Sequence, residues 1–471
     1  MKKAKKLLSL VAVFASLFGA AYAVDLRGLQ DDQRVLLNPD KGWYHHFYDN
    51  GLDKYLSSEA SIASIPNMHH LFLRFAWSFL EPEEGKFNWA LIDDIVNKWN
   101  PKGVKISLGI SCNETGLKYA TPKWVFDAGA KGRIAKTRWG FEVAEPNCDD
   151  PVFLEKLENL HKAIAARYDG KPFIEDMTIL SIGNWGEGHY WATFGKVVSW
   201  EAIKKNIDLY KRCYKKSQIV INNGVITSNL KSDEEQQVAR EYVKKSKFGY
   251  RDDSILVAWH YFERCKNGTL PLVRTEYFDD IYPFAPATLE LEHYHATRKS
   301  GSWKGANGSE EGAKVLVRTL RETHCTFLGY HGYAEQYIKD NPEFIKQAAN
   351  LLGYWYFINS ANFDDDGNLV LEWENRGVAH AFTRYRLFAK ITGNGIDKKI
   401  PLLNADNRKW EPNTPVKETY SLALGDLPAG EYELSIGMKS SAKKDARVIE
   451  LGLKEGLRDS DGFYRILKFK K

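Results

Sequence analysis

The chain has 471 residues, of which 44% are hydrophobic and 27% are charged, with 66 Lys and Arg against 61 Asp and Glu. This apolar content excludes an intrinsically disordered protein, and five cysteines in such a length exclude a disulfide-stapled mini-domain. Setting aside the four lysines of the first 23 residues lowers the formal net charge from +5 to +1, which gives no electrostatic footprint for nucleic acid.

Residues 1–23 have the pattern of a signal peptide. A lysine-rich start precedes an apolar run from Leu7 to Ala20, and Ala21-Tyr22-Ala23 matches the small-x-small rule for signal-peptidase cleavage. The run is short for a bilayer span, which needs about 20 residues, and no lipobox cysteine follows it. We therefore expect an exported protein, periplasmic or extracellular, with no membrane span in the mature chain. The alternative is an uncleaved membrane anchor.

Residues 24–358 alternate short apolar runs with longer amphipathic stretches. The clearest helix is Pro151–Tyr168, whose apolar residues recur with a period near 3.6 after an Asp149-Asp150 start signal. Eight strands separated by helices predict an α/β fold, a (β/α)8 TIM barrel. The expected strands are Gly42–Phe47, Leu71–Trp77, Lys105–Ser111, Met177–Gly183, Gln218–Asn222, Ser254–His260, Leu270–Glu276 and Cys325–Tyr330.

Residues 359–471 have a different texture. Segments such as Asn368–Glu374 alternate apolar and polar residues, and turn signals such as Asp366-Gly367 separate them. A period of two with frequent turns is typical of an antiparallel β-sandwich. We expect such a domain after the barrel.

Two glutamates at the ends of predicted barrel strands are the candidate catalytic residues. Catalytic groups of such barrels lie at the carboxyl ends of the strands, where Glu187 follows the fourth predicted strand and Glu276 ends the seventh. Two facing carboxyls suit the hydrolysis of a glycosidic bond, in which one donates a proton and the other attacks the anomeric carbon or activates water. Glu290 and Glu292 are close enough in sequence to replace Glu276, and the sequence leaves that choice open.

Other side chains near the predicted strand ends are candidates for substrate binding. Arg74, flanked by apolar residues, needs a carboxylate partner and is suited to hold a nucleophile ionised. A structural ion pair is the alternative for Arg74, and an ordinary buried histidine is the alternative for each histidine. The full set is Arg74, Trp77, Asn184, Trp185, His189, His260, Tyr261, His45, His46 and Glu292.

We predict neither a metal nor another cofactor. The sequence has no HExxH motif, no CxxC pair and no clustered carboxylate triad beside its histidines. The stretch from Asn113 to Asp149 is long and carries Trp124 and Trp139, so we expect it to wall one side of a pocket.

Two segments resemble known families. The run Arg74-x-x-Trp77-x-x-x-Glu81-Pro82-x-Glu84-Gly85 is similar to the start of glycoside hydrolase family 42 and of clan A barrels generally. Gly183–His189, with the C-terminal part of the chain, resembles secreted bacterial proteins that carry the domain of unknown function 4832. The first resemblance implies an acid/base on strand four, a nucleophile on strand seven and Arg74 beside that nucleophile. In clan A an asparagine directly precedes the acid/base, whereas Gly186 stands there in this chain.

The sequence therefore predicts an exported glycoside hydrolase acting on an oligo- or polysaccharide, retaining if the two carboxyls lie about 5–5.5 Å apart. A non-catalytic carbohydrate-binding protein that uses the barrel mouth is the alternative, and a structural envelope protein is a third. The sugar, the linkage and the oligomeric state are not readable from the sequence.

Overall fold

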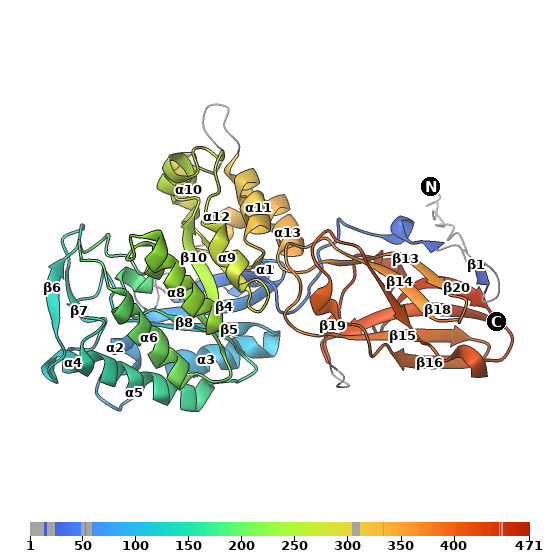
Figure 1. Cartoon of the computed structure of the whole chain (residues 1–471), viewed down its shortest axis with the longest axis horizontal. Helices are drawn as coiled ribbons and strands as arrows, with labels where there is room; N and C mark the ends of the chain where they lie inside the picture. The colour runs from blue at the N-terminus through green and yellow to red at the C-terminus, as the bar shows by residue number, and fades with distance from the viewer. Residues whose placement is uncertain are drawn as a thin grey trace, which may run out of the picture. The chain divides into compact units, whose positions relative to one another are not determined.

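The computed structural model describes residues 14–16, 24–48, 52, 59–303, 311–332, 334–441, 443 and 446–471 (Figure 1). The chain divides into two compact units. One consists of residues 41–352, and the other combines the chain up to Asp40 with residues 353–471.

The unit of residues 41–352 contains a closed barrel of eight parallel strands, and the prediction of a TIM barrel is confirmed. The strands follow one another around the barrel in chain order. They are β3 (Gly42–Tyr48), β4 (Met68–Ala76), β5 (Lys105–Ser111), β8 (Ile174–Ile179), β9 (Gln218–Asn222), β10 (Gly249–Ile255), β11 (Ala287–Leu291) and β12 (Cys325–Tyr330).

The predicted sixth and seventh strands are wrong. Strand six is β10, so most of Ser254–His260 lies beyond it and enters the short π-helix η4 (Trp259–Arg264). Strand seven is β11, and the predicted strand Leu270–Glu276 is a loop that runs into helix α9 (Thr275–Ile281). Both true strands were hidden because buried charged residues interrupt their apolar runs: β10 contains Arg251-Asp252-Asp253 and β11 contains Glu290.

The helices between the strands largely follow the amphipathic pattern, and α5 (Pro151–Tyr168) has the bounds that the sequence predicts. Helix α5 begins where the sequence indicates, because the Asp150 carboxylate accepts hydrogen bonds from the backbone N–H groups of Val152 and Phe153, both at 3.0 Å. The longer helices are α3 (Ala90–Trp99), α5 (Pro151–Tyr168), α6 (Trp200–Cys213), α8 (Asp233–Lys245), α11 (Gly312–Glu322) and α13 (Pro342–Leu351).

The barrel interior is apolar at one level and charged at the next. Tyr44, Phe72, Leu180 and Phe327 form a buried cluster inside the barrel. The Arg251 guanidinium lies 4.3 Å from the centre of the Phe72 ring, so it caps this cluster. The inward residues beyond it are ionisable, and they form the candidate active site.

The second unit is built from two β-sheets, as the sequence predicts. One sheet has the order β17 (Val416–Tyr420), β14 (Leu369–Asn375), β13 (Tyr356–Phe363) and β2 (Val24–Asp25), and the other contains β1 (Phe14–Ser16), β20 (Tyr464–Lys470), β18 (Glu431–Lys439), β15 (Arg386–Gly393), β16 (Ile396–Pro401) and β19 (Val448–Ile449). Because β2 pairs with β13, the residues just after the predicted leader belong to this unit and not to the barrel. In the described part of the chain, no helix is long and apolar enough to cross a membrane.

The sequence run that follows β4 forms a tight structural turn. Trp77 is fully buried in helix α2 (Trp77–Leu80), so its predicted role in substrate binding is wrong. Its indole Nε1–H donates to the carboxylate of Glu81 at 2.7 Å, and the same carboxylate accepts from the backbone N–H of Gly85 at 2.8 Å. The Glu-Pro-x-Glu-Gly run is therefore explained by local structure.

This turn gives a stability prediction. Glu81→Ala leaves two donors without their partner and should lower the free energy of unfolding by about 2–3 kcal/mol. The matched control is Glu83→Ala in the same turn, where the side chain is exposed and pairs with Lys86, and the expected change is below about 0.5 kcal/mol. Urea denaturation measures both values. Equal effects of the two substitutions would contradict this explanation of the motif.

Candidate active site

Glu187 lies in a sharply turned loop after β8. Gly186 and Gly188 have positive φ angles of 79° and 84°. A Cβ atom at Gly186 would lie 2.5 Å from Leu180 Cα, and one at Gly188 would lie 2.3 Å from the Val225 backbone. The glycines thus allow the loop to fold against the barrel wall. They do not expose the carboxyl, since the Glu187 side chain is only 14% exposed.

Both carboxylate oxygens of Glu187 have a partner. Arg74 Nη1 donates to Oε1 at 2.8 Å, and His189 Nε2 lies 3.2 Å from Oε2. Burial raises the pKa of Glu187, but the His189 contact and the Arg74 charge outweigh burial and lower this pKa to about 2. Glu187 is therefore held ionised, whereas a general acid requires a raised pKa.

Glu290 is a second buried carboxylate, and it lies on β11, the true seventh strand. Its side chain is 2% exposed, and Arg251 Nη2 donates to its Oε2 at 2.6 Å. Burial raises the pKa of Glu290, but His46, His331 and Arg251 together bring this pKa well below its usual range. Glu290 is therefore an ionised carboxylate that is almost completely buried.

Asp253 connects the two glutamates. It lies on β10, accepts a hydrogen bond from the side-chain amide of Asn222, and pairs with the Arg251 guanidinium at 3.0 Å. Burial raises the pKa of Asp253; Arg251 opposes this effect, and Glu187 and Glu290 add to it. Because the charges of both glutamates raise the pKa of Asp253, the three carboxyl groups are close enough to interact electrostatically.

Buried imidazoles surround the carboxylates. Burial lowers the pKa of His46 to about 3, with Glu290 opposing and Arg74 adding to this shift, and it lowers the pKa of His293 to about 3 as well. One ligand atom each of His46, Glu290 and His331 lies within 4.8 Å of the others, a spacing that fits a metal ion. However, the guanidiniums of Arg251 and Arg74 are adjacent to this group and oppose a further cation there. We therefore base the chemistry on the carboxylates.

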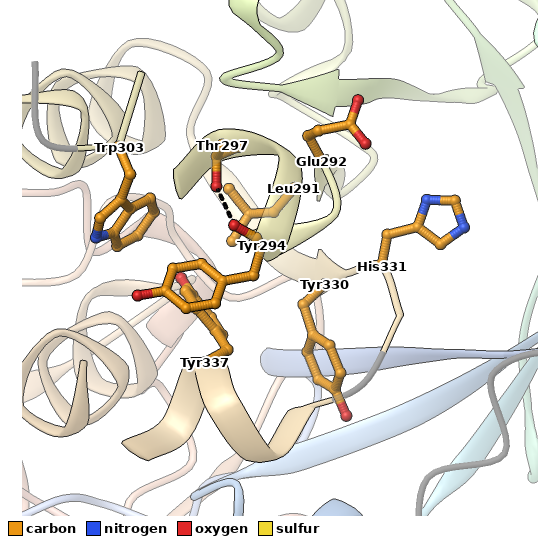
Figure 2. Close-up of a pocket in the computed structure, with 8 residues that line it drawn as sticks. All are labelled: Leu291, Glu292, Tyr294, Thr297, Trp303, Tyr330, His331 and Tyr337. Carbon is orange, nitrogen blue, oxygen red and sulfur yellow. Dashed lines mark hydrogen bonds between the residues drawn. The ribbon is translucent and has the colours of Figure 1, made fainter. Parts of the chain in front are cut away.

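A small pocket adjoins the part of this site that contains His331 (Figure 2). Glu292 and His331 lie on one side of it, while Tyr294, Trp303 and Tyr337 gather on the other. The Glu292 carboxylate accepts from the His293 backbone N–H at 2.8 Å. Burial raises the pKa of Glu292, with this hydrogen bond and His331 opposing and Glu290 and Glu187 adding to the shift. Glu292 thus lies near both Glu187 and Glu290.

Glu276 is not part of this cluster. It lies in the first turn of α9, and its side chain is 45% exposed. Its Oε1 lies 4.0 Å from Arg274 Nη1. The prediction that it ends strand seven is wrong because the true strand begins eleven residues later, at Ala287. Arg74 also differs from expectation, since it pairs with Glu187 while Arg251 holds the strand-seven carboxylate.

The remaining predicted binding residues divide into two groups. Asn184 donates to Thr193 Oγ1 at 3.0 Å and accepts from the Ala192 backbone at 2.9 Å, so its amide serves the loop. His45 is buried and stacks on Tyr330, and Tyr261 is buried inside η4. His46 is fully buried beside Glu290, and those that lie nearer the mouth are Trp185, His189, His260 and Glu292.

Sequence reasoning missed several residues of the cluster. Arg251 and Asp253 are two residues apart on β10, so both side chains point into the barrel. Tyr44 on β3 also points inward, and its hydroxyl lies 3.5 Å from Glu290 Oε2. The segment Gly249–Ile255 carries three consecutive charged residues, Arg251-Asp252-Asp253, so an alternating pattern does not single out the two that face inward. His331 directly follows β12 and had no pattern of its own.

Part of the barrel unit is similar in sequence to known proteins. Residues 60–185 match the model of glycoside hydrolase family 42, which is described as beta-galactosidase. The segment stops two residues before Glu187 and does not reach Glu290. A curated relative, beta-galactosidase BbgII of Bifidobacterium bifidum, is 24% identical over 141 residues, and the alignment covers 29% of this chain but only 18% of that protein.

Solved structures with a related architecture have low sequence identity. The catalytic domain of beta-amylase from Paenibacillus polymyxa has 10% identity and a TM-score of 0.45, covering 66% of this chain and 98% of that one. Endo-glycoceramidase II from Rhodococcus sp. has 10% identity and a TM-score of 0.44, covering 83% and 99%. Beta-galactosidase from Marinomonas ef1 has 13% identity and a TM-score of 0.35, covering 58% and 51%.

The neutral histidines predict how stability depends on pH. The folded pKa of His46 is about 3, below the value of about 6.5 in an unfolded chain. The unfolded chain therefore binds protons that the folded site excludes, and the resulting stability is present above pH 6.5 and is lost as the pH falls. Between pH 6.5 and 5, His46 alone should account for a loss of about 1–2 kcal/mol.

Urea unfolding of wild type and His46→Gln at pH 7.5 and pH 5.0 measures this loss. The variant should be less stable at pH 7.5 yet lose less stability on acidification. The same loss in both proteins would show that His46 is not kept neutral by the fold.

Proposed function

We propose that the protein is a retaining glycoside hydrolase in which Glu290 is the nucleophile and Glu187 the acid/base. The observation that carries the proposal is the placement of two buried carboxylates after strand four and on strand seven, within one electrostatic cluster. The match of residues 60–185 to a glycoside hydrolase family supports it. Glu290 takes the role that the sequence first gave to Glu276.

The reaction has two steps. In the first, a carboxylate oxygen of Glu290 bonds to the anomeric carbon, the glycosidic C–O bond breaks, and the proton of Glu187 goes to the leaving oxygen. In the second, Glu187 takes a proton from water, the water oxygen bonds to the anomeric carbon, and the Glu290 ester bond breaks. The product keeps the anomeric configuration of the substrate.

Substrate binding must raise the pKa of Glu187 for the first step. Arg74 is buried and fixes Oε1, whereas His189 is 31% exposed and contacts Oε2. A leaving oxygen that approaches Oε2 displaces His189, and this removes the hydrogen bond that does most to lower this pKa. Ionised Glu290 also raises the pKa of Glu187, so ester formation lowers this pKa again and suits Glu187 to act as a base.

A non-catalytic carbohydrate-binding protein is the second candidate. One observation favours it: Glu187 is held ionised by Arg74 and His189, as in a site that binds hydroxyl groups and transfers no proton. The two candidates differ in whether the carboxylates are needed for turnover.

Three matched substitutions test the catalytic assignment. Glu187→Gln and Glu290→Gln should each lower kcat at least about a thousandfold, because each removes the proton donor or the nucleophile. Glu276→Gln, on the exposed side of α9, should keep at least half of the wild-type rate. The measurement is release of aryl alcohol from a panel of aryl glycosides, with thermal melts to verify folding. Loss of activity in Glu276→Gln alone would contradict the assignment, and sugar binding without turnover by wild type would favour the second candidate.

We also propose that the protein is exported after cleavage behind Ala23. The next residues, Val24 and Asp25, form β2 and pair with β13, so cleavage there keeps the edge of that sheet, while it removes β1 from its pairing with β20 at the edge of the other sheet. Expression of the full chain in a Gram-negative host should yield a periplasmic protein whose intact mass and first residue correspond to a start at Val24. A cytoplasmic protein that retains Met1 would contradict the proposal.

A further inference from the structure

The barrel mouth carries a group of aromatic side chains beside Glu187, called here the aromatic platform and consisting of Trp139, Trp185, Trp191 and Phe194. Three of its members are exposed, Trp139 by 53%, Trp191 by 55% and Phe194 by 63%. Large aromatic side chains are usually buried, so several exposed together indicate a binding surface.

The rings of the platform form a continuous series that starts at the candidate acid/base. His189 contacts Glu187, and the Trp185 ring lies 5.8 Å from the His189 ring, centre to centre. Trp139 follows at 6.2 Å from Trp185, and Trp191 lies 5.7 Å from Trp139. The series therefore leads outward from the carboxyl that protonates the leaving group.

Two loops hold the platform in place. Trp139 lies in the hairpin between β6 (Gly132–Lys136) and β7 (Glu142–Pro146), and the other rings follow β8. The Arg138 backbone N–H donates to the Ala192 carbonyl at 2.9 Å, and Arg138 Nε donates to the Trp191 carbonyl at 2.7 Å. Thr193 Oγ1 donates to the Glu145 carboxylate at 2.6 Å, which links the hairpin and the loop a second time. A surface tied down this way loses little entropy on binding.

The conformation of Trp185 also indicates a positioned ring. Trp185 has a left-handed backbone, with φ 57° and ψ 9°, which is rare for a bulky residue. Its backbone N–H donates to the Asn113 carbonyl at 2.7 Å, which fixes this conformation. Strained residues of this kind concentrate at ligand-binding sites.

The chemistry of the platform favours a sugar chain over a lipid or a protein face. The Arg138 guanidinium lies 4.5 Å from the centre of the Trp191 ring and 4.4 Å from that of Phe194, so a charged donor lies within the platform. Neighbouring rings are inclined at 57° and 66°, which makes separate facets and not one flat apolar face. Pyranose rings present apolar C–H faces to such facets and hydroxyl groups to a guanidinium.

We propose that the aromatic platform binds the leaving-group side of an oligosaccharide, so that the substrate is a chain of three or more sugars cleaved with sugar residues on the platform. This inference rests on the proposed function, because Glu187 as acid/base defines which side is the leaving group. It gives the long segment after β5 a specific role, since the hairpin supplies Trp139.

Chain-length dependence of turnover tests the inference. For wild type, kcat/KM should rise from aryl glycosides to trisaccharides and longer chains of the same sugar. Trp139→Ala and Trp191→Ala should lower kcat/KM for the longer chains about tenfold or more, while aryl glycosides stay within about twofold of wild type. Trp139→Phe should recover most of the loss. Val238→Ala, at an exposed position on α8, is the control and should change neither value.

Binding measurements separate failure of this inference from failure of the proposed function. If wild type hydrolyses no glycoside, calorimetric titration of the wild type with the oligosaccharides still tests the platform, and the two tryptophan variants should bind about tenfold more weakly. Equal losses for short and long substrates, or unchanged affinity for the long chains, would overturn the inference. So would a wild-type dimer in sedimentation that Trp191→Ala dissociates, since a second copy would then occupy the platform.

Discussion

Two buried guanidiniums, together with neighbouring imidazoles, keep the carboxylates of the barrel mouth charged. Arg74 and Arg251 come from opposite strands of the barrel, β4 and β10, and each is almost fully removed from water. Burial alone would drive Glu187 and Glu290 to take up protons, and the charge of Glu290 raises the pKa of Glu187 further. The His189 contact and the Arg74 charge oppose this at Glu187, and His46, His331 and Arg251 oppose it at Glu290. Burial keeps the nearby histidines neutral, and Arg74 adds to this effect at His46 and His331.

The barrel and the C-terminal sheets could be predicted from the sequence because they follow from hydrophobic periodicity. Five of the eight barrel strands begin or end within a residue or two of their expected bounds, since β3, β5, β9 and β12 are mostly apolar and β4 has a single charge. The predictions of strands β10 and β11 failed because of the same charged residues that form the candidate active site. Their inward positions carry Arg251, Asp253 and Glu290. In a pattern of apolar residues, a strand with buried charges looks like a loop.

A residue of the site could be predicted only where its neighbours in sequence indicate where the side chain lies in the fold. Gly186 and Gly188 mark a turn that the chain needs in order to present Glu187, so that residue was found. Glu290 has no such marker, and its role depends on Arg251, His46 and His331, which come from three other segments of the chain. Trp77 shows the opposite error, because a tryptophan in a motif looked like a binding residue and is instead held by Glu81 in the wall of the barrel.

The central claim is that Glu290 attacks the sugar, and chemical trapping tests it most directly. An activated 2-deoxy-2-fluoro glycoside of the sugar that the enzyme turns over should form a stable ester, because the fluorine slows the second step more than the first. Peptide mapping by mass spectrometry should then locate the added sugar mass on Glu290. An adduct on Glu276 or Glu292, or hydrolysis with inversion and no adduct, would contradict the account.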